Sequence, residues 1–391
     1  MRVLIVLTYY RPHTSGLTIY AERLAQGLAK RGHEVTVLTS RYQRRLPAKE
    51  RIDGVQIVRV PALFRVSKGV IMPTFGLAAW KWVNWADVLS LHLPQFDAAG
   101  VALRGRLLRK PATLTYHCDL RLPPGPFNAL VNRVVQTMNH LAGRFSHAVV
   151  AYTEDFAAHS PFLQRFAEKV HVIPPPVALP DVGDSGPAAF AKMYNPENRH
   201  PVIGMAARFA SEKGVGVLLD AFPRVLERYP HARIWFAGQY RDVMGEEAYF
   251  ERLAPRIERY RQEGQWRFLG VLNPLQMASF YPNLDVVVVP SLNSTESFGL
   301  VQVEAMLCGT PSVASNLPGV RQPVLQTGMG EVAPIGDAEG LAEALLKVLD
   351  QRAAYVRPRE EIEARFSIER TVEGYETLFA ELQERLGRQK G

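Results

Sequence analysis

The order of hydrophobic and polar positions near the start of the chain predicts a βαβ unit. Val3–Leu7 is a continuous apolar run, which is typical of a strand that is covered on both faces. After a polar loop, Leu24 and Leu28 lie one helical turn apart in a predicted helix. Gly32 stands where such a helix ends, and Glu34–Thr39 is the next apolar strand. Parallel strands joined by crossover helices follow from this order.

The pattern restarts in the second half of the chain. Apolar runs predict strands over Val202–Ala207, Arg233–Ala237, Trp266–Leu269, Asp285–Val289 and Pro311–Ala314. Periodic segments predict helices over Val215–Arg228, Glu246–Gln262, Leu275–Phe280 and Leu300–Leu307. The predicted fold class is therefore α/β, with two Rossmann-like, doubly wound domains that face each other across a cleft. Such sheets bind ligands at the carboxyl ends of their strands, so we expect the chemistry in the loops that follow the strands.

A proline-rich segment and a change of charge separate the two halves. Pro174–Pro176 cannot continue a helix or a central strand. Residues 1–175 carry 23 Lys and Arg against 10 Asp and Glu, whereas residues 176–391 carry 23 against 28. With 391 residues, the chain also exceeds what one hydrophobic core usually serves. We predict a first domain over 1–175, a linker over 176–200, a second domain over 201–366 and a final helical segment over 367–391.

Composition and cysteine content point to a globular protein of a reducing compartment. Apolar residues make up 47% and charged residues 21%, which excludes a disordered chain. Cys118 and Cys308 stand far apart, so a disulfide framework and a Cys-rich zinc site are excluded. The longest mostly apolar stretch, 69–80, contains Pro73 and is well short of the ~20 residues of a spanning helix. We expect a soluble, cytoplasmic protein.

The loop from Pro290 has the chemistry of a phosphate and sugar site. A predicted helix begins near Phe298, and its free N–H groups and dipole favour an anion. Glu296 lies just before that start, and Glu304 lies ~9 Å down the helix axis from Phe298. Carboxylates accept hydrogen bonds from hydroxyls, so the pair suits a ligand with a sugar at each end of a diphosphate. The alternative is that Glu296 only faces the helix dipole and that Glu304 is solvated.

Two cations follow the first strand of the second half. Arg208 and Lys213 lie five residues apart across a tight loop that ends at Gly214. Together they can hold a diphosphate and neutralise the charge on a leaving nucleotide, a role that otherwise needs a metal. The alternative is surface charge beside Glu212.

Two first-half loops contribute further candidates. His117 follows the apolar run 112–114, where an imidazole can hydrogen-bond a substrate or move a proton near neutral pH. Gly16, in the loop after the first strand, lets the backbone approach a ligand closely. A structural histidine and a simple turn are the alternatives.

Several common motifs are missing. No Asp-x-Asp sequence occurs, which argues against a metal-dependent, single-sheet sugar transferase. The GxGxxG pattern fails at Leu219, which argues against a dinucleotide oxidoreductase, and no GxxxxGK motif of a P-loop NTPase is present. No helix-turn-helix, zinc-finger or RNP-like motif accompanies the basic charge, so nucleic acid is not an expected partner.

Taken together, these segments resemble the GT-B glycosyltransferases of family 4 over essentially the whole chain. The E-x7-E signature of that family reads Glu296–Glu304 here, inside a block that ends at Pro311. Its diphosphate loop matches Arg208 and Lys213-Gly214. The end of the opening helix, residues 31–35, is also similar to the sequence that the family has there. Order, spacing and strand-loop-helix context agree over residues 290–311.

The resemblance implies a retaining transfer from a nucleotide-diphosphate sugar, such as a UDP- or GDP-sugar, without a metal or another cofactor. It implies that Arg208 and Lys213 hold the diphosphate and that Glu304 binds the ribose hydroxyls. It also implies that Glu296 binds the donor sugar and that His117 lies beside the anomeric centre. Backbone groups of Phe298 and Gly299 would touch phosphate or sugar. The first domain would bind the acceptor, the second would bind the nucleotide sugar, and the last helix would cross back onto the first domain.

Two positions depart from the family pattern. The first loop of the family often has Gly-Gly, whereas this chain has Ser15-Gly16, so only Gly16 carries over. The domain junction usually reads Pro-Asn-Gly, whereas this chain has Pro174–Pro176, which suggests a stiffer hinge. A sugar-nucleotide epimerase of the same architecture and a non-catalytic subunit that binds a sugar nucleotide remain as alternative functions.

The positive charge of the first half is clustered. One group consists of Arg41, Arg44, Arg45, Lys49 and Arg51, and another of Arg104, Arg106, Arg109 and Lys110. Between the two groups lie Phe64, Val70, Ile71, Met72, Phe75, Trp80, Trp82 and Trp85. Basic residues bind anionic lipids, and indole rings favour headgroup depth. We therefore expect peripheral binding to the inner face of a membrane and a lipid-linked acceptor, a glycolipid or polysaccharide intermediate. The alternative is that the tryptophans belong to the core and that the acceptor is small and soluble.

Overall fold

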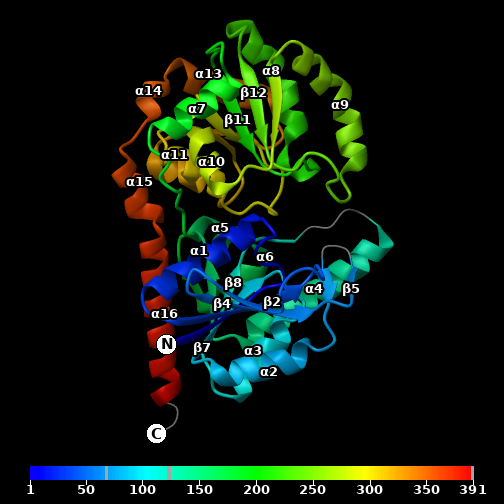
Figure 1. Cartoon of the computed structure of the whole chain (residues 1–391), viewed down its shortest axis with the longest axis vertical. Helices are drawn as coiled ribbons and strands as arrows, with labels where there is room; N and C mark the ends of the chain where they lie inside the picture. Colours follow the sequence, from blue (N-terminus) through cyan, green and yellow to red (C-terminus); the bar gives the residue numbers. More distant parts are fainter. Residues whose placement is uncertain (67–68, 121–124, 389–391) are drawn as a thin grey trace. The chain divides into compact units, whose positions relative to one another are not determined.

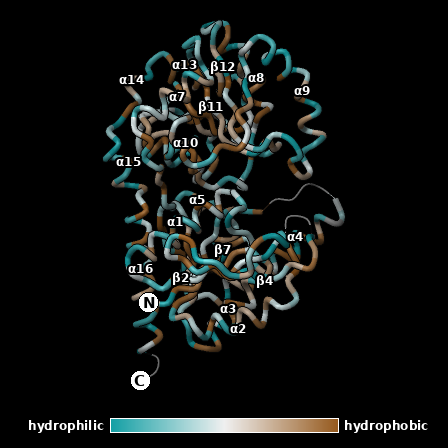
Figure 2. The backbone as a smooth tube through the Cα atoms, in the orientation of Figure 1, coloured by the Kyte–Doolittle hydropathy of each residue, from teal (hydrophilic) through white to brown (hydrophobic). Residues whose placement is uncertain are grey.

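The computed structural model describes residues 1–66, 69–120 and 125–388, without the side chains of Val66 and Phe127. The chain divides into two compact units (Figure 1). Unit 1 comprises Met1–Pro176 and Phe366–Gly391, and unit 2 comprises Val177–Arg365. Each unit has its own sheet, and hydrophobic residues run through the strands of both (Figure 2). The predicted α/β class with two Rossmann-like domains is confirmed.

Unit 1 is built on an eight-stranded sheet in the order β10-β9-β8-β7-β1-β2-β4-β3, in which the β3–β4 pair is antiparallel and the other pairs are parallel. Its strands are β1 Arg2–Val6, β2 Glu34–Arg41, β3 Lys49–Ile52, β4 Val55–Pro61, β7 Val88–Leu93, β8 Ala112–Tyr116, β9 Ala148–Ala151 and β10 Val170–Val172. A separate hairpin is formed by β5 Phe64–Val66 and β6 Gly69–Ile71. The helices are α1 Gly16–Lys30, α2 Phe75–Trp85, α3 Ala98–Leu107, α4 Pro126–Phe145, α5 Glu154–His159, α6 Pro161–Arg165 and, from the end of the chain, α16 Ile368–Arg388.

Most of the aromatic and apolar residues expected at a membrane surface belong to the core of unit 1. Val70, Met72, Phe75 and Trp82 are at least 92% buried, because the hairpin and α2 pack on the sheet beside β1 and β7. This part of the sequence prediction is wrong. Trp80, on the outer side of α2, is 49% exposed.

The last helix, α16, packs against α1 on unit 1. Tyr375 of α16 bonds through its hydroxyl to the Tyr20 hydroxyl of α1 at 2.8 Å and to the Thr115 hydroxyl of β8 at 2.6 Å. All three residues are completely buried. One face of α16 is therefore part of the interior of unit 1.

Unit 2 is built on a six-stranded parallel sheet in the order β13-β12-β11-β14-β15-β16. Its strands are β11 Val202–Ala206, β12 Arg233–Ala237, β13 Trp266–Gly270, β14 Val286–Val289, β15 Ser312–Ser315 and β16 Gly330–Ala333. Its helices are α7 Ser185–Tyr194, α8 Val215–Arg228, α9 Glu247–Gln262, α10 Pro274–Phe280, α11 Leu300–Met306, α12 Gln322–Thr327, α13 Ala338–Asp350, α14 Arg352–Tyr355 and α15 Arg359–Phe366. Successive side chains of β12 alternate between the two faces: Phe236 packs in the cluster with α8, α9 and α13, and Trp235 packs with α7 and α10.

The segment 176–200, predicted as a linker, is largely part of unit 2. It contains helix α7, whose Phe190 is 7% exposed. The Phe190 ring packs against Trp235 of the sheet and Phe280 of α10. The prolines before it belong to unit 1, where the Pro174 carbonyl accepts from Thr371 and the Pro176 carbonyl from Arg23. The chain thus divides after Pro176, and the helix that follows the prolines packs in unit 2.

Candidate functional site

In unit 2, the loop after β11 and the loop after β14 are joined backbone to backbone. β11 and β14 are neighbouring strands, so the two loops leave the same edge of the sheet. The Leu292 N–H donates to the Glu212 carbonyl at 2.9 Å. Gly214 has φ +76°, and a Cβ added there would stand 1.9 Å from the Pro290 carbonyl oxygen. Both the left-handed conformation and the close approach require glycine at this position.

The same contact brings together the predicted Lys213 and Glu296. The Lys213 Nζ lies 2.7 Å from Glu296 Oε2, and the two side chains are 16% and 24% exposed. The other oxygen, Oε1, accepts from the Gly299 N–H at 3.0 Å. Burial opposes ionisation of Glu296, but Lys213 and the N–H groups of Gly299 and Phe298 outweigh burial and lower the pKa of the carboxyl. Glu296 is therefore a carboxylate at neutral pH, held by one cation and the loop backbone.

Arg208 and Glu304 lie on either side of this pair in the sequence. The Arg208 guanidinium is 42% exposed and donates to Glu212 at 3.1 Å. Glu304 is only 6% exposed and accepts from the Tyr281 hydroxyl at 2.7 Å. The alternative of a solvated Glu304 is thereby excluded. Tyr281 was missed by the sequence analysis, because nothing in the spacing of the two residues relates them.

The helix after the β14 loop, α11, starts at Leu300. This agrees with the periodic segment predicted over Leu300–Leu307 and lies two residues after the start near Phe298 that was expected for the anion site. Gly299 precedes the helix with φ +77°, a left-handed conformation that cannot belong to a right-handed helix. Phe298 is 1% exposed, so its side chain belongs to the core.

His117, just after β8 in unit 1, is 5% exposed and has protein partners on both ring nitrogens. Its Nε2 lies 2.8 Å from His92 Nδ1, and its Nδ1 bonds to the Tyr152 hydroxyl. Burial, together with His92, holds the pKa of His117 well below its ordinary value. The lowered pKa favours the neutral imidazole at pH 7, and the role of His117 beside a substrate stays a prediction.

The buried histidines make the stability of unit 1 depend on pH. Burial lowers the pKa of His92 to about 3 and holds that of His117 well below its ordinary value. Below pH ~6.5 the unfolded chain therefore binds protons that the folded chain does not, and the free energy of unfolding falls with falling pH. We expect His92 to contribute a loss of about 2 kcal/mol between pH 7 and pH 5. Urea unfolding of the wild type and of His92→Asn at both pH values measures this, and an equal pH dependence in the two proteins would contradict it.

Gly16 is the first residue of α1, behind the N-cap residue Ser15, whose hydroxyl accepts from the Thr18 N–H. Its φ is not in the left-handed region, and a Cβ added there would meet no atom within 4 Å. The conformation thus does not require glycine, and the backbone there is open to a close neighbour. Gly16 and His117 belong to unit 1, and the other predicted residues belong to unit 2.

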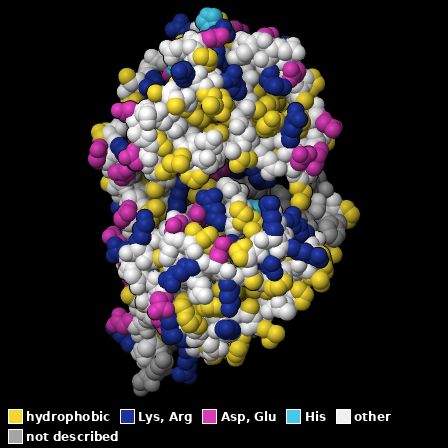
Figure 3. All heavy atoms as spheres, in the orientation of Figure 1, with side chains coloured by type: hydrophobic (Ala, Val, Ile, Leu, Met, Phe, Trp, Pro, Cys, Tyr) yellow, Lys and Arg dark blue, Asp and Glu magenta, His cyan; other side chains and the backbone are white. Residues whose placement is uncertain are grey.

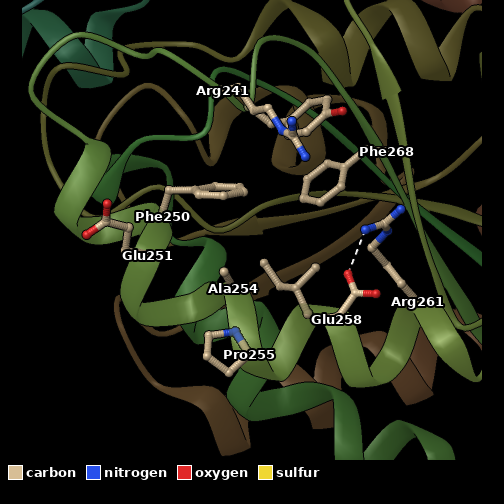
Figure 4. Close-up of a pocket in the computed structure, with 10 residues that line it drawn as sticks. Arg241, Phe250, Glu251, Ala254, Pro255, Glu258, Arg261 and Phe268 are labelled. Carbon is tan, nitrogen blue, oxygen red and sulfur yellow. Dashed lines mark hydrogen bonds and ion pairs between the residues drawn. The ribbon is translucent and has the colours of Figure 1, made fainter.

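A pocket of about 450 Å³ in unit 2 lies apart from all the predicted residues (Figure 4). It lies between α9 and the edge strand β13. Its aromatic wall is made of Tyr240 stacked on Phe268 at 4.1 Å, with Phe250 opposite, and Glu258 pairs with Arg261 on its α9 side.

A metal-holding cluster and a membrane-spanning helix are both absent from the described ranges, 1–66, 69–120 and 125–388. These ranges contain no group of three or more His, Cys, Asp or Glu side chains arranged to hold a metal ion. They also contain no helix with both the length and the apolar character needed to cross a bilayer.

Comparison with known families agrees with this arrangement of two sheets and their loops. The family described as glycosyl transferases group 1 matches residues 189–365, and the glycosyl transferase 4-like domain matches residues 15–176. The chain belongs to the GT-B glycosyltransferases of family 4. It is therefore a transferase enzyme.

One curated relative matches most of this glycosyltransferase, and another matches just under half of it. The phosphatidyl-myo-inositol mannosyltransferase of Mycolicibacterium smegmatis is 27% identical over 362 residues, covering 91% of this chain and 87% of the relative. The D-inositol 3-phosphate glycosyltransferase of Corynebacterium urealyticum is 34% identical over 187 residues, or 46% of this chain and 43% of the relative.

Solved structures support the fold. Sucrose-phosphate synthase from Thermosynechococcus elongatus superposes with a TM-score of 0.75 at 21% identity, covering 97% of this chain and 98% of that one. HepE of Anabaena, in complex with UDP-glucose, gives a TM-score of 0.75 at 20% identity, covering 97% and 100%.

Proposed function

We propose that this glycosyltransferase takes its sugar from a UDP- or GDP-sugar, retains the anomeric configuration and needs no metal. The observation that carries the proposal is the Lys213–Glu296 pair, which lies where the two interlocked loops of unit 2 meet. A cation and a carboxylate side by side, with loop N–H groups next to them, provide partners for a phosphate and for sugar hydroxyls. Retention follows from the E-x7-E signature of the family.

In this proposal each predicted residue has one task. Arg208 and Lys213 hold the diphosphate and stabilise the charge of the leaving nucleotide, as a metal does in other transferases. Glu304 binds the ribose, and Glu296 binds the donor sugar. The Tyr281 hydroxyl, which donates to Glu304, fixes the orientation of that carboxylate.

The remaining residues act through the backbone or on the reacting sugar. The backbone of Phe298 and Gly299 contacts the phosphate or the sugar, and the backbone at Gly16 approaches the ligand closely. His117 lies beside the anomeric carbon of the donor sugar, as a neutral imidazole whose two ring nitrogens are held by Tyr152 and His92.

The test is nucleotide release in the presence of EDTA. The full chain is given UDP-glucose or GDP-mannose, with and without vesicles that contain phosphatidylinositol, the lipid in the name of one relative. We expect one donor to release its nucleotide when an acceptor is present, at a rate that EDTA leaves unchanged. Activity that EDTA abolishes and Mg²⁺ or Mn²⁺ restores would refute the metal-independent site. Conversion of the donor sugar without an acceptor would indicate an epimerase.

We further propose that the acceptor is lipid-linked and that unit 1 meets it at an anionic membrane surface. α2 and α3 pack together, and their outer sides expose Leu77 (78%), Trp80 (49%) and Leu107 (68%). Exposed Lys81 and Arg106 stand on the same two helices. Lys and Arg side chains are spread over the face of unit 1 that Figure 3 presents. Apolar side chains among cations suit the boundary between lipid headgroups and acyl chains.

Vesicle co-sedimentation tests the membrane proposal. We expect binding to anionic but not to zwitterionic vesicles, weakened by salt because exposed charges are screened. The double variant Trp80→Glu/Leu107→Glu should lose at least about ten-fold in vesicle affinity, since each change removes buried apolar area and adds a repelled charge. Leu325→Glu, an equally exposed leucine of unit 2 (60%), should bind like the wild type. Equal binding by all three proteins would end this proposal.

A further inference from the structure

A chain of polar side chains runs across the carboxyl ends of three neighbouring strands of unit 1. His92 is the residue before the last in β7, His117 follows β8 and Tyr152 follows β9. Tyr152 bonds to Nδ1 of His117, and Nε2 of His117 lies 2.8 Å from Nδ1 of His92. Nε2 of His92 lies 3.4 Å from the Ser90 hydroxyl. The four groups form one line of hydrogen bonds, and none is more than 7% exposed.

The line accounts for the protons of both imidazoles. A neutral imidazole carries one N–H, so each ring donates from one nitrogen and accepts at the other. A ring nitrogen is a better acceptor than a phenolic oxygen, and a phenol is a ready donor, so Tyr152 donates to Nδ1 of His117. His117 must then donate from Nε2 to His92, and His92 donates from Nε2 to Ser90. Every ring nitrogen is satisfied without a charge.

In addition to these hydrogen bonds, both histidines pack against an aromatic ring of α1. The Tyr20 ring of α1 meets His117 edge-on at 5.0 Å and His92 at 5.8 Å, and it stacks on Tyr152 at 5.2 Å. Tyr20 is held in turn by the Tyr375 hydroxyl of α16. Among the described residues, the titratable groups His92 from β7, Tyr152 from the end of β9 and Tyr20 from α1 face His117.

We propose that Tyr152 and His92 are positioning residues that keep His117 neutral, in the Nε2–H tautomer and in one ring orientation. The proposal rests on the role of His117 in the proposed function, and it adds which residues fix the protonation, the tautomer and the ring orientation of His117. Tyr152 acts through His117, so its loss should lower turnover more than donor affinity, because the donor is bound by unit 2.

Histidine NMR tests the proposal without an activity assay. In the full chain with ¹⁵N-labelled histidine, the His117 signal is identified by its loss in His117→Gln. We expect the Nε2–H tautomer and no titration between pH 5 and 8. In Tyr152→Phe, Nδ1 loses its donor, so His117 should populate both tautomers or titrate in this range. Tyr116→Phe is the control: it removes a hydroxyl at the end of the same strand, β8, but this hydroxyl donates to Asp119. The His117 signal should therefore stay unchanged in Tyr116→Phe. A wild-type His117 that titrates near neutral pH, or a Tyr152→Phe spectrum like that of the wild type, would overturn the proposal.

Turnover gives the second readout, as nucleotide release from whichever of UDP-glucose and GDP-mannose the wild type uses. We expect Tyr152→Phe and His92→Leu to lower kcat about 10- to 100-fold, with donor affinity within about two-fold of the wild type. His92→Asn keeps an acceptor near the position of Nδ1 and should recover most of the rate. Normal turnover in His117→Ala would refute the role of His117 in the proposed function and leave the NMR result intact. An inactive His117→Ala beside a Tyr152→Phe that is normal in both readouts would refute the positioning proposal alone.

Discussion

Replacing Lys213 by alanine should lower turnover by about 10²- to 10³-fold. A charge-assisted contact to the leaving diphosphate is worth about 2–4 kcal/mol in the transition state. Lys213 is the cation that the structure places at the meeting point of the two loops. Lys192→Ala removes the same charge from an exposed position of unit 2 and should have no effect. Steady-state nucleotide release, after thermal unfolding has shown that each variant is folded, measures the difference.

The ion pair complicates this prediction and also offers its control. Lys213 is largely buried and paired, so its removal leaves Glu296 without its cation. An unpaired, partly buried carboxylate is itself destabilising, by about 1–3 kcal/mol. The double variant Lys213→Ala/Glu296→Gln removes that penalty. If the double variant regains the wild-type rate, Lys213 serves only Glu296 and the diphosphate role is wrong; we expect the rate to stay low.

Gly214→Ala should abolish donor binding and destabilise unit 2. The new Cβ would stand 1.9 Å from the Pro290 carbonyl oxygen, so one of the two loops must move. The left-handed φ of +76° adds about 1–2 kcal/mol for a residue with a Cβ. Because the loops carry Lys213 and Glu296, their separation should also break the ion pair. Donor titration by calorimetry and thermal unfolding measure the two effects.

Gly245→Ala is the matched control for this variant. Gly245 also lies in unit 2 and has φ +80°, but a Cβ there would meet no atom within 4 Å. Its substitution therefore carries the conformational cost without the collision. We expect a modest loss of stability and normal donor affinity. Equal effects of the two substitutions would show that contact between the loops does not shape the site.

Continuous apolar runs predicted the strands well because both faces of these strands are covered. Val3–Leu7 and Val202–Ala207 are observed as β1 Arg2–Val6 and β11 Val202–Ala206. The apolar stretch 69–80 was harder to interpret, since it combines a hairpin strand with the start of α2. Most of the apolar side chains that the sequence analysis expected at a membrane surface pack in the core there.

The surroundings of the candidate site depend on contacts that sequence spacing does not reveal. His117 was found as a polar residue after an apolar run, but His92 and Tyr152 lie 25 and 35 residues away in the chain. The alternation Ser90-Leu91-His92 in a strand was the available signal, because it places two polar side chains on one face. The left-handed φ of Gly299 explains why α11 starts at Leu300 and not near Phe298, and this conformation cannot be deduced from the periodic pattern.

The proposed donor site in unit 2 is tested most directly by a crystal structure of the full chain with UDP-glucose or GDP-mannose, in EDTA. We expect the diphosphate oxygens within hydrogen-bond distance of the Lys213 ammonium and the Arg208 guanidinium. We also expect the ribose hydroxyls on Glu304 and the sugar on Glu296. A nucleotide bound elsewhere, for example among Tyr240, Phe250 and Phe268 in the pocket of Figure 4, with the Lys213–Glu296 pair unchanged, would contradict the proposed site.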